Sequence, residues 1–387
     1  MDNKNAQTFR SKIYSVIFAT YNLEMRHFCW LFLLVSMVSF AQENGETNAV
    51  DVTFLTGNVL PHTDDLSHLI TGHPQGVMVN FSRQTHGDKE WQKVYGYPDY
   101  GAYLLYQDYK NTILGEVYAV GAHYNFYSLS RRFVFKISQG IAYATNPHDK
   151  ETNSKNNAFG SAIMANTNFA FTYKKENIVD RIGFQAGILF THFSNGRIQA
   201  PNSGVNTYNI NVGLNYNLDK QLSRTLDTVV PNLTFKEPLH YNFVLRTGVN
   251  ESSIIGSGQH PFYHVGFYVD KRLGRKSALQ LGTEVFFSLF YKDFIKYQTV
   301  AYPDQGLDPN TDYKRVGLFV GHELFINRIS LEAQIGYYVY QPYKFDIPIY
   351  DRLGMKYYLT KNMFTGLSIK THIFLAEAME FVVGVRF

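Results

Sequence analysis

The feature that most constrains this chain is a two-residue alternation of apolar and polar side chains, repeated from about residue 51 to the C-terminus. Alternating segments of roughly ten residues are separated by clusters of Gly, Asn, Asp and Pro. In 206–218 the even positions from Tyr208 to Leu218 are apolar or aromatic, and the odd positions are Thr, Asn or Gly. Successive side chains of a strand point to opposite faces, so each segment predicts a strand with one apolar and one polar face.

Sixteen segments follow this pattern, the first two being the least clear, and fourteen strands is the alternative count because the order of short and long connections is strained at 84–98. The candidate strands are 51–59, 74–83, 99–108, 115–127, 132–144, 160–174, 179–194, 206–218, 241–250, 261–271, 277–292, 313–326, 328–341, 350–359, 362–372 and 376–387. The polar face opposite an aromatic-rich face fits water inside and lipid outside better than the shared core of a soluble sandwich.

The composition supports a membrane barrel built from strands. No run of about 20 apolar residues occurs after position 41, as a membrane helix would require. The 29 Tyr and 31 Phe suit aromatic girdles at the two bilayer interfaces. We therefore expect an all-β fold, a transmembrane antiparallel up-and-down β-barrel of about 14–16 strands over residues 42–387. The net charge of +4 is scattered, and it does not indicate a nucleic-acid surface.

The N-terminus predicts a signal peptide over residues 1–41. The apolar run from Phe28 to Ala41 is too short to span a bilayer, and Ser39 and Ala41 are the small residues that a signal peptidase reads. Cleavage is expected before Gln42, and Met25 is an alternative start that would give a signal of conventional length. The single Cys29 lies within the signal, so the mature chain would contain no thiol.

The C-terminal strand alternates Met379, Phe381, Val383 and Val385 up to the terminal Phe387. Barrel-assembly machinery of the outer membrane recognises this kind of ending, which predicts insertion into the outer membrane of a Gram-negative bacterium. With both termini periplasmic, even-numbered junctions should be short and odd-numbered ones long. That parity breaks at 219–240, a long connection that could fold inward or across the periplasmic mouth, and it is strained at 84–98.

One stretch, residues 192–206, carries candidate chemistry. On strand 179–194 the even positions form the lipid-facing stripe, and His192 and Ser194 continue it. Residues two apart in a strand have Cα atoms roughly 6.6 Å apart, close enough for an imidazole to reach a hydroxyl. Asn206 opens the next strand on its outward face. The three side chains could be ordinary polar residues at an interface, or a nucleophile, a general base and a group that orients the base.

The stretch resembles the outer-membrane lipid A 3-O-deacylases (PagL-like acyloxyacyl hydrolases). That family has an H-x-S-N motif, then P-N-x-G-x and an acid, and His192, Ser194, Asn195, Pro201, Asn202, Gly204 and the position of Asn206 match in order and spacing. The resemblance is plausible over roughly 95–218, and 241–387 is additional. It implies a serine esterase without cofactor or metal, in which Asn195, Asn202 or Gly204 surrounds the oxyanion or the substrate.

The family acid is replaced by Asn206, so the resemblance leaves the activity open. An acid from a neighbouring loop, such as Glu151, is one substitute, and the asparagine itself can accept the imidazole N–H. The leading hypothesis is an outer-membrane esterase that removes an ester-linked acyl chain from lipid A or lipopolysaccharide. The alternative is a non-catalytic channel or structural barrel, because a barrel of fourteen or sixteen strands has a wide lumen.

Overall fold

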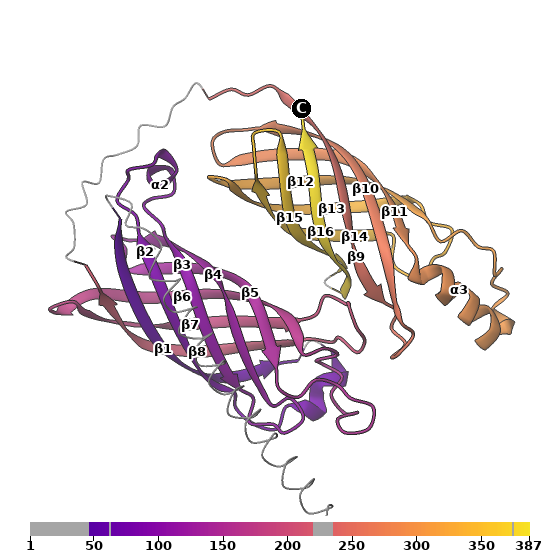
Figure 1. The fold of residues 1–387 in the computed structure, drawn as a ribbon, viewed down its shortest axis with the longest axis horizontal. Helices are drawn as coiled ribbons and strands as arrows, with labels where there is room; N and C mark the ends of the chain where they lie inside the picture. The colour runs from indigo at the N-terminus through magenta and orange to yellow at the C-terminus, as the bar shows by residue number, and fades with distance from the viewer. Residues whose placement is uncertain (1–45, 62, 220–234, 374) are drawn as a thin grey trace, which may run out of the picture. The chain divides into compact units, whose positions relative to one another are not determined.

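The computed structural model describes residues 46–387 except 62, 220–234 and 374. The expected signal peptide and the alternative start at Met25 lie outside the described residues. Among the described residues, no helix is long and apolar enough to cross a membrane. The described residues form antiparallel strands, which close into two separate barrels (Figure 1).

The N-terminal barrel has eight strands in sequential order, and its last strand pairs back with its first from Ala49↔Asn217 to Leu60↔Asn206. Its strands are β1 (Thr47–Leu60), β2 (Gln75–Gln84), β3 (Asp99–Asp108), β4 (Glu116–Ser128), β5 (Phe133–Ala144), β6 (Ile163–Val179), β7 (Ile182–Ser194) and β8 (Val205–Asn217). Two short helices lie in its connections, η1 (Asp64–Leu69) between β1 and β2 and α2 (Glu90–Val94) between β2 and β3.

The C-terminal barrel is also eight-stranded, and β16 closes on β9 from Phe381↔Thr247 to Arg386↔Asn242. Its strands are β9 (Leu239–Glu251), β10 (Gln259–Arg272), β11 (Ser277–Ser288), β12 (Arg315–Ile326), β13 (Ile329–Tyr340), β14 (Ile349–Tyr358), β15 (Met363–His372) and β16 (Leu375–Arg386). The long connection from β11 to β12 contains α3 (Phe290–Ala301) and η2 (Pro303–Gln305).

The expected strands are confirmed within a few residues, but their closure differs from the expectation of one barrel over 42–387. The sixteen strands of the described chain divide into eight and eight, and the connection 219–240 joins the two barrels. This explains the parity break: the eighth junction was expected to be a short turn within one barrel, but it links the last strand of the first barrel to the first strand of the second. The strand expected over 277–292 ends at Ser288. The helix α3 begins at Phe290, and its buried residues at 290, 291, 294 and 295 follow a helical spacing.

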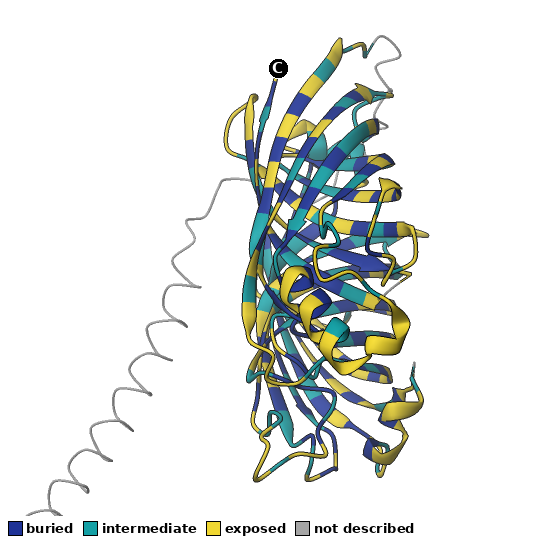
Figure 2. Ribbon diagram, turned by 90° about the vertical axis from the view of Figure 1, so that its right-hand side faces the viewer, coloured by how far each residue is buried: buried dark blue, intermediate teal, exposed yellow. Residues whose placement is uncertain are grey.

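Buried and exposed residues alternate along the strands (Figure 2), and many of the exposed ones are large apolar side chains. Phe54, Ile188 and Ile210 of the N-terminal barrel are about three-fifths exposed or more, and so are Leu281 and Ile335 of the C-terminal barrel. Apolar side chains exposed on nearly every strand of a closed barrel are the lipid-facing surface of a transmembrane barrel.

The inward faces are filled by side chains. In the N-terminal barrel, Asp51 accepts hydrogen bonds from Asn80 (2.7 Å) and Gln185 (2.9 Å). At the end of this barrel where β7 gives way to β8, Leu66, Leu69 and Phe193 belong to an apolar cluster. A barrel of eight strands is just wide enough for its interior side chains, so this lumen is packed.

The C-terminal barrel holds a buried network of charges. Arg352 pairs with Glu284 (2.6 Å) and Glu380 (2.7 Å), and Lys356 pairs with Glu332 (2.5 Å). All five side chains are fully buried. Buried ions are tolerated only when they are paired in this way, so the network closes the lumen and fixes which strands face one another.

Candidate active site

The candidate site lies where β7 ends and β8 begins, on the outer face of the N-terminal barrel. The two strands pair with His192 opposite Asn206 and Phe193 opposite Val205. Phe193 points inward and is completely buried in the apolar cluster, which fixes the side chains on either side of it as outward. The outward placement of His192, Ser194 and Asn206 predicted from their spacing is confirmed.

The three side chains form a hydrogen-bonded chain. Nδ1 of His192 lies 2.6 Å from Oδ1 of Asn206, and Nε2 of His192 lies 3.0 Å from Oγ of Ser194. An oxygen acceptor at Asn206 requires the imidazole proton to be on Nδ1, so the lone pair of Nε2 faces the serine hydroxyl. This is the tautomer in which a neutral histidine can take a proton from serine.

The loop 195–204 covers the serine. Ser194 is only 5 % exposed, although it lies on the outer face of its strand. Gly204 has φ +69°, and a Cβ there would lie 3.1 Å from Cβ of Ser194 and 3.4 Å from Cε1 of His192. Gly204 is therefore a position where the backbone passes close to Ser194 and His192 and where only glycine fits without strain.

The asparagines of the motif have different partners. The side-chain amide of Asn195 donates to Oγ of Ser161 (3.1 Å) and to the carbonyl of Gln199 (2.8 Å), and its backbone N–H donates to Oδ1 of Asn202 (2.8 Å). The backbone N–H of Gly204 donates to the carbonyl of Ala158 (3.1 Å). Asn202 thus accepts a hydrogen bond through its side-chain oxygen, whereas the amide hydrogens of Asn195 and Gly204 are themselves bound to acceptors.

The connection 145–162, between β5 and β6, is hydrogen-bonded to the loop 195–204, a contact that the sequence pattern did not indicate. The backbone carbonyl of Asn157 accepts from the backbone N–H of Ser203 (3.1 Å), next to the bond between Gly204 and Ala158. Asn156 is completely buried and accepts from the backbone of Ala158 and Phe159 (both 3.0 Å). A run of Asn residues between two strands is the one signal in the sequence that this connection has an ordered structure.

Glu151, considered as a substitute acid, lies in the same connection and is exposed. Its backbone N–H donates to Asp149, whose pKa is lowered by the backbone and hydroxyl donors of Thr152. The position next to Nδ1 of His192 is occupied by Asn206. The expectation that Glu151 could take the place of the family acid is therefore not supported.

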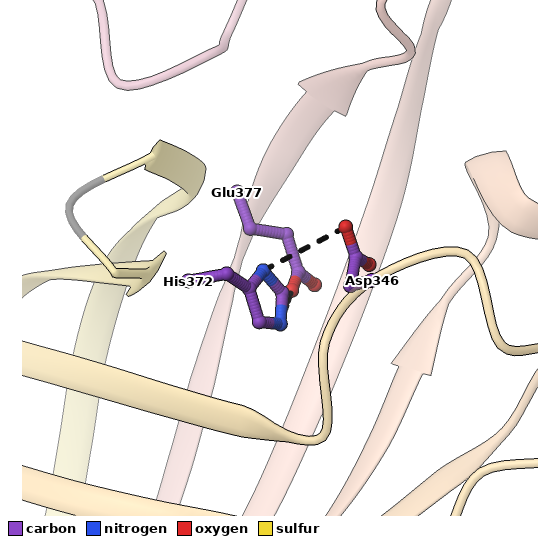
Figure 3. Close-up of side chains that lie close together, drawn as sticks. All are labelled: Asp346, His372 and Glu377. Atoms are coloured by element: carbon purple, nitrogen blue, oxygen red, sulfur yellow. Dashed lines mark ion pairs between the residues drawn. The ribbon is translucent and has the colours of Figure 1, made fainter.

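A second group of potential ligands lies in the C-terminal barrel, where Asp346, His372 and Glu377 converge (Figure 3). Nε2 of His372 lies 3.4 Å from Glu377, and Nδ1 lies 3.8 Å from Asp346. Arg315 pairs with both carboxylates, and Lys370 pairs with Glu377. Burial raises the pKa of Asp346, with the Glu377 charge acting in the same direction. A divalent cation would have to displace two resident cations, so the group is an ion-pair cluster.

Another serine–histidine contact lies inside the C-terminal barrel, and no sequence motif indicates it. Nε2 of His264 lies 3.2 Å from Oγ of Ser288, and Nδ1 lies 2.7 Å from Glu380. All three side chains are completely buried, and the rings of Phe262 and Phe286 pack on the imidazole. Because it is completely buried and includes Glu380, this arrangement is part of the packed charge network.

Fold and site together define a protein of two transmembrane β-barrels, with a serine–histidine–asparagine site on the outer face of the N-terminal one. Residues 75–215 match the family model of the lipid A 3-O-deacylases (PagL), and residues 239–387 match the model of the acyloxyacyl hydrolase C-terminal domain. The chain therefore belongs to the PagL-like family. Membership supports ester hydrolysis of lipid A at the level of the family. No curated protein matches the chain.

Three solved structures illustrate the likeness to known barrels. The TodX monoaromatic hydrocarbon channel (deltaS2 mutant) is 8 % identical over 90 % of each chain, with a TM-score of 0.17. The siderophore receptor PirA from Acinetobacter baumannii is 11 % identical over 85 % of this chain and 43 % of the receptor, with a TM-score of 0.21. OccAB3 from Acinetobacter baumannii is 9 % identical over 89 % of this chain and 99 % of its own, with a TM-score of 0.21.

Proposed function

We propose that the chain is a serine esterase of the outer membrane of a Gram-negative bacterium, and that it removes an ester-linked acyl chain from lipid A or lipopolysaccharide. The observation that carries the proposal is the hydrogen-bonded chain from Asn206 through His192 to Ser194, with the lone pair of Nε2 facing the hydroxyl. The family match supports the substrate class. The position of the site on the lipid-facing side suits a substrate that arrives laterally within the bilayer.

The residues present suffice for acyl transfer. Ser194 Oγ forms a bond to the ester carbonyl carbon while its proton passes to Nε2 of His192. The imidazolium then gives this proton to the departing alcohol oxygen as the ester C–O bond breaks. Water then attacks the acyl carbon while His192 takes a proton from it. The bond between the acyl carbon and Oγ of Ser194 breaks, His192 returns the proton to Oγ, and the fatty acid leaves. Asn206 holds the imidazole on the required tautomer throughout.

The negative charge that develops on the carbonyl oxygen needs a hydrogen-bond donor. We assign this role to the side-chain amide of Asn202, because its oxygen is occupied by the backbone N–H of Asn195, which orients the remaining N–H groups. Asn195 acts on the shape of the loop, since its amide hydrogens are bound to Ser161 and Gln199. Loss of one oxyanion donor typically costs about 10²–10³ in kcat.

Incubation of purified, folded chain with lipid A in detergent tests the proposal. Wild type should release a free fatty acid, and Ser194→Ala should release none. Ser128→Ala is the matched control, since it removes an exposed serine hydroxyl at the C-terminal end of β4. Equal release by wild type and Ser194→Ala would show that the proposed mechanism is wrong.

The channel considered as an alternative lacks a supporting observation. Both barrels have eight strands, and buried side chains fill both interiors.

We further propose that the assembly machinery recognises the C-terminal strand. The terminal Phe387 is 71 % exposed and is joined to β9 by two backbone hydrogen bonds with Tyr241.

A further inference from the structure

Glu251, the last residue of β9 in the C-terminal barrel, is bonded to the loop that covers Ser194. Its side chain is almost completely buried, at 3 % exposure. One carboxylate oxygen accepts the backbone N–H of Ala200 (2.8 Å), and the other accepts the backbone N–H of Gly258 (3.1 Å). Hydrogen bonds to a charged acceptor are about twice as strong as neutral ones, so this carboxylate is a firm anchor for Ala200.

The backbone around Glu251 adds further bonds to the same loop. The N–H of Glu251 donates to the carbonyl of Arg197 (3.0 Å), and Nε of Arg197 donates to the carbonyl of Glu251 (3.1 Å). The side-chain amide of Gln259 donates to the carbonyl of Ile198 (3.0 Å). A Cβ on Gly196 would lie 2.8 Å from Cβ of Met379 in β16. The segment 196–200 is thus held by residues of the C-terminal barrel over most of its length.

The same segment shapes the reactive end of the loop. The carbonyl of Gln199, adjacent to Ala200, accepts from the side chain of Asn195, and Asn202 accepts from the backbone of Asn195. Asn195 directly follows Ser194 in the chain. A displacement of Ala200 would therefore move Asn195, beside the proposed nucleophile, and through it Asn202, the proposed oxyanion donor.

From these contacts we propose that Glu251 is a positioning residue for the Ser194 site, and that one function of the C-terminal barrel is to brace the loop 195–204. The inference rests on the proposed esterase function and adds a role for residues 239–387, which the motif itself does not include. A shift of about 1 Å at a catalytic group can reduce a rate about a hundredfold, so a brace of this kind determines kcat.

The test compares Glu251→Gln and Glu251→Ala with wild type in the full chain, with Ser252→Ala as the matched control. Glutamine fills the same volume but offers an N–H group to one of the two backbone donors. Ser252 is also buried, and it bonds to Ser257 rather than to loop 195–204. Ester hydrolysis gives kcat and KM, and hydrogen–deuterium exchange of the peptide that contains Ala200 reports the brace without reference to activity.

We expect both Glu251 variants to lower kcat about tenfold to a hundredfold with little change in KM, and to speed exchange at Ala200. Ser252→Ala should change neither quantity. Unchanged kcat in both Glu251 variants, or an equal fall in Ser252→Ala, would overturn the inference. Ser194→Ala is measured alongside, because activity that survives without this hydroxyl contradicts the esterase mechanism. Faster exchange at Ala200 in the Glu251 variants without a fall in kcat contradicts the positioning role alone.

Discussion

Replacement of Asn206 by aspartate should increase the activity of this chain. The substitution changes one atom type and restores the acid that the family motif carries at this position. Oδ1 of Asn206 already lies 2.6 Å from Nδ1 of His192, so a carboxylate oxygen can take its place without a change in geometry. Asn206 is half-buried and lies at the start of β8, and a carboxylate near a membrane interface costs little.

The size of the effect follows from the tautomer. Replacing the acid of a serine triad by Asn can cost about 10⁴ in rate when the amide forces the wrong tautomer. Here the oxygen of Asn206 faces Nδ1, so that part of the loss is absent. What remains is the difference between a neutral and a charge-assisted hydrogen bond to the imidazolium, about 1–2 kcal/mol. At about 1.4 kcal/mol for each factor of ten, Asn206→Asp should raise kcat by roughly tenfold.

Steady-state release of fatty acid from lipid A by the two purified proteins measures this change, with heat-modifiable migration on gels as the check of folding. Asn206→Ala should fall well below wild type, because the imidazole then loses its tautomer-fixing partner. A folded Asn206→Asp protein with unchanged or lower kcat would refute the assignment of Asn206 as the partner of His192.

Three further predictions concern the loop, the charge network and the lumen. Gly204→Ala should lower kcat at least tenfold, because the new Cβ meets Ser194 and His192 at a positive φ, and the fatty-acid assay with a folding check would contradict this if the rate stayed unchanged. Arg352→Met should destabilise the C-terminal barrel by about 3–5 kcal/mol, since it leaves Glu284 and Glu380 without this partner. Urea unfolding in liposomes measures the loss, and the control Lys110→Ala, at an exposed ion pair, should leave the unfolding midpoint unchanged. Equal midpoints for wild type and both variants would contradict the prediction. Planar-bilayer recordings of wild type should show no stable conductance, because both eight-stranded interiors are filled, and a reproducible single-channel current would contradict that description.

The strands could be predicted from the sequence because their alternation is a local property. Segments 99–108 and 328–341 needed little or no adjustment in the structure, as Asp99–Asp108 and Ile329–Tyr340. The closure could not be predicted in the same way. Alternation specifies which side chains face inward, but it does not specify that β8 returns to β1, because that pairing joins residues far apart in the chain.

The parts of the candidate site that depend on local spacing could also be predicted, and those that depend on long-range packing could not. His192 and Ser194 share a face by their spacing, and Asn206 meets them because consecutive strands pair. The contacts of Asn157, Ala158 and Glu251 with the loop depend on how separate connections pack, which no periodicity records. The parity break at 219–240 was the one sequence signal of two barrels, since a long connection on the side of the short turns separates two closed units.

Mass spectrometry of lipid A from cells that express the full chain tests the central claim most directly. Cells with wild type should contain lipid A that lacks the mass of one acyl chain, and cells with Ser194→Ala at equal outer-membrane levels should contain the unmodified lipid. Unmodified lipid A in both strains, or the same loss of mass in both, would contradict the account of Ser194 as the nucleophile of a lipid A deacylase.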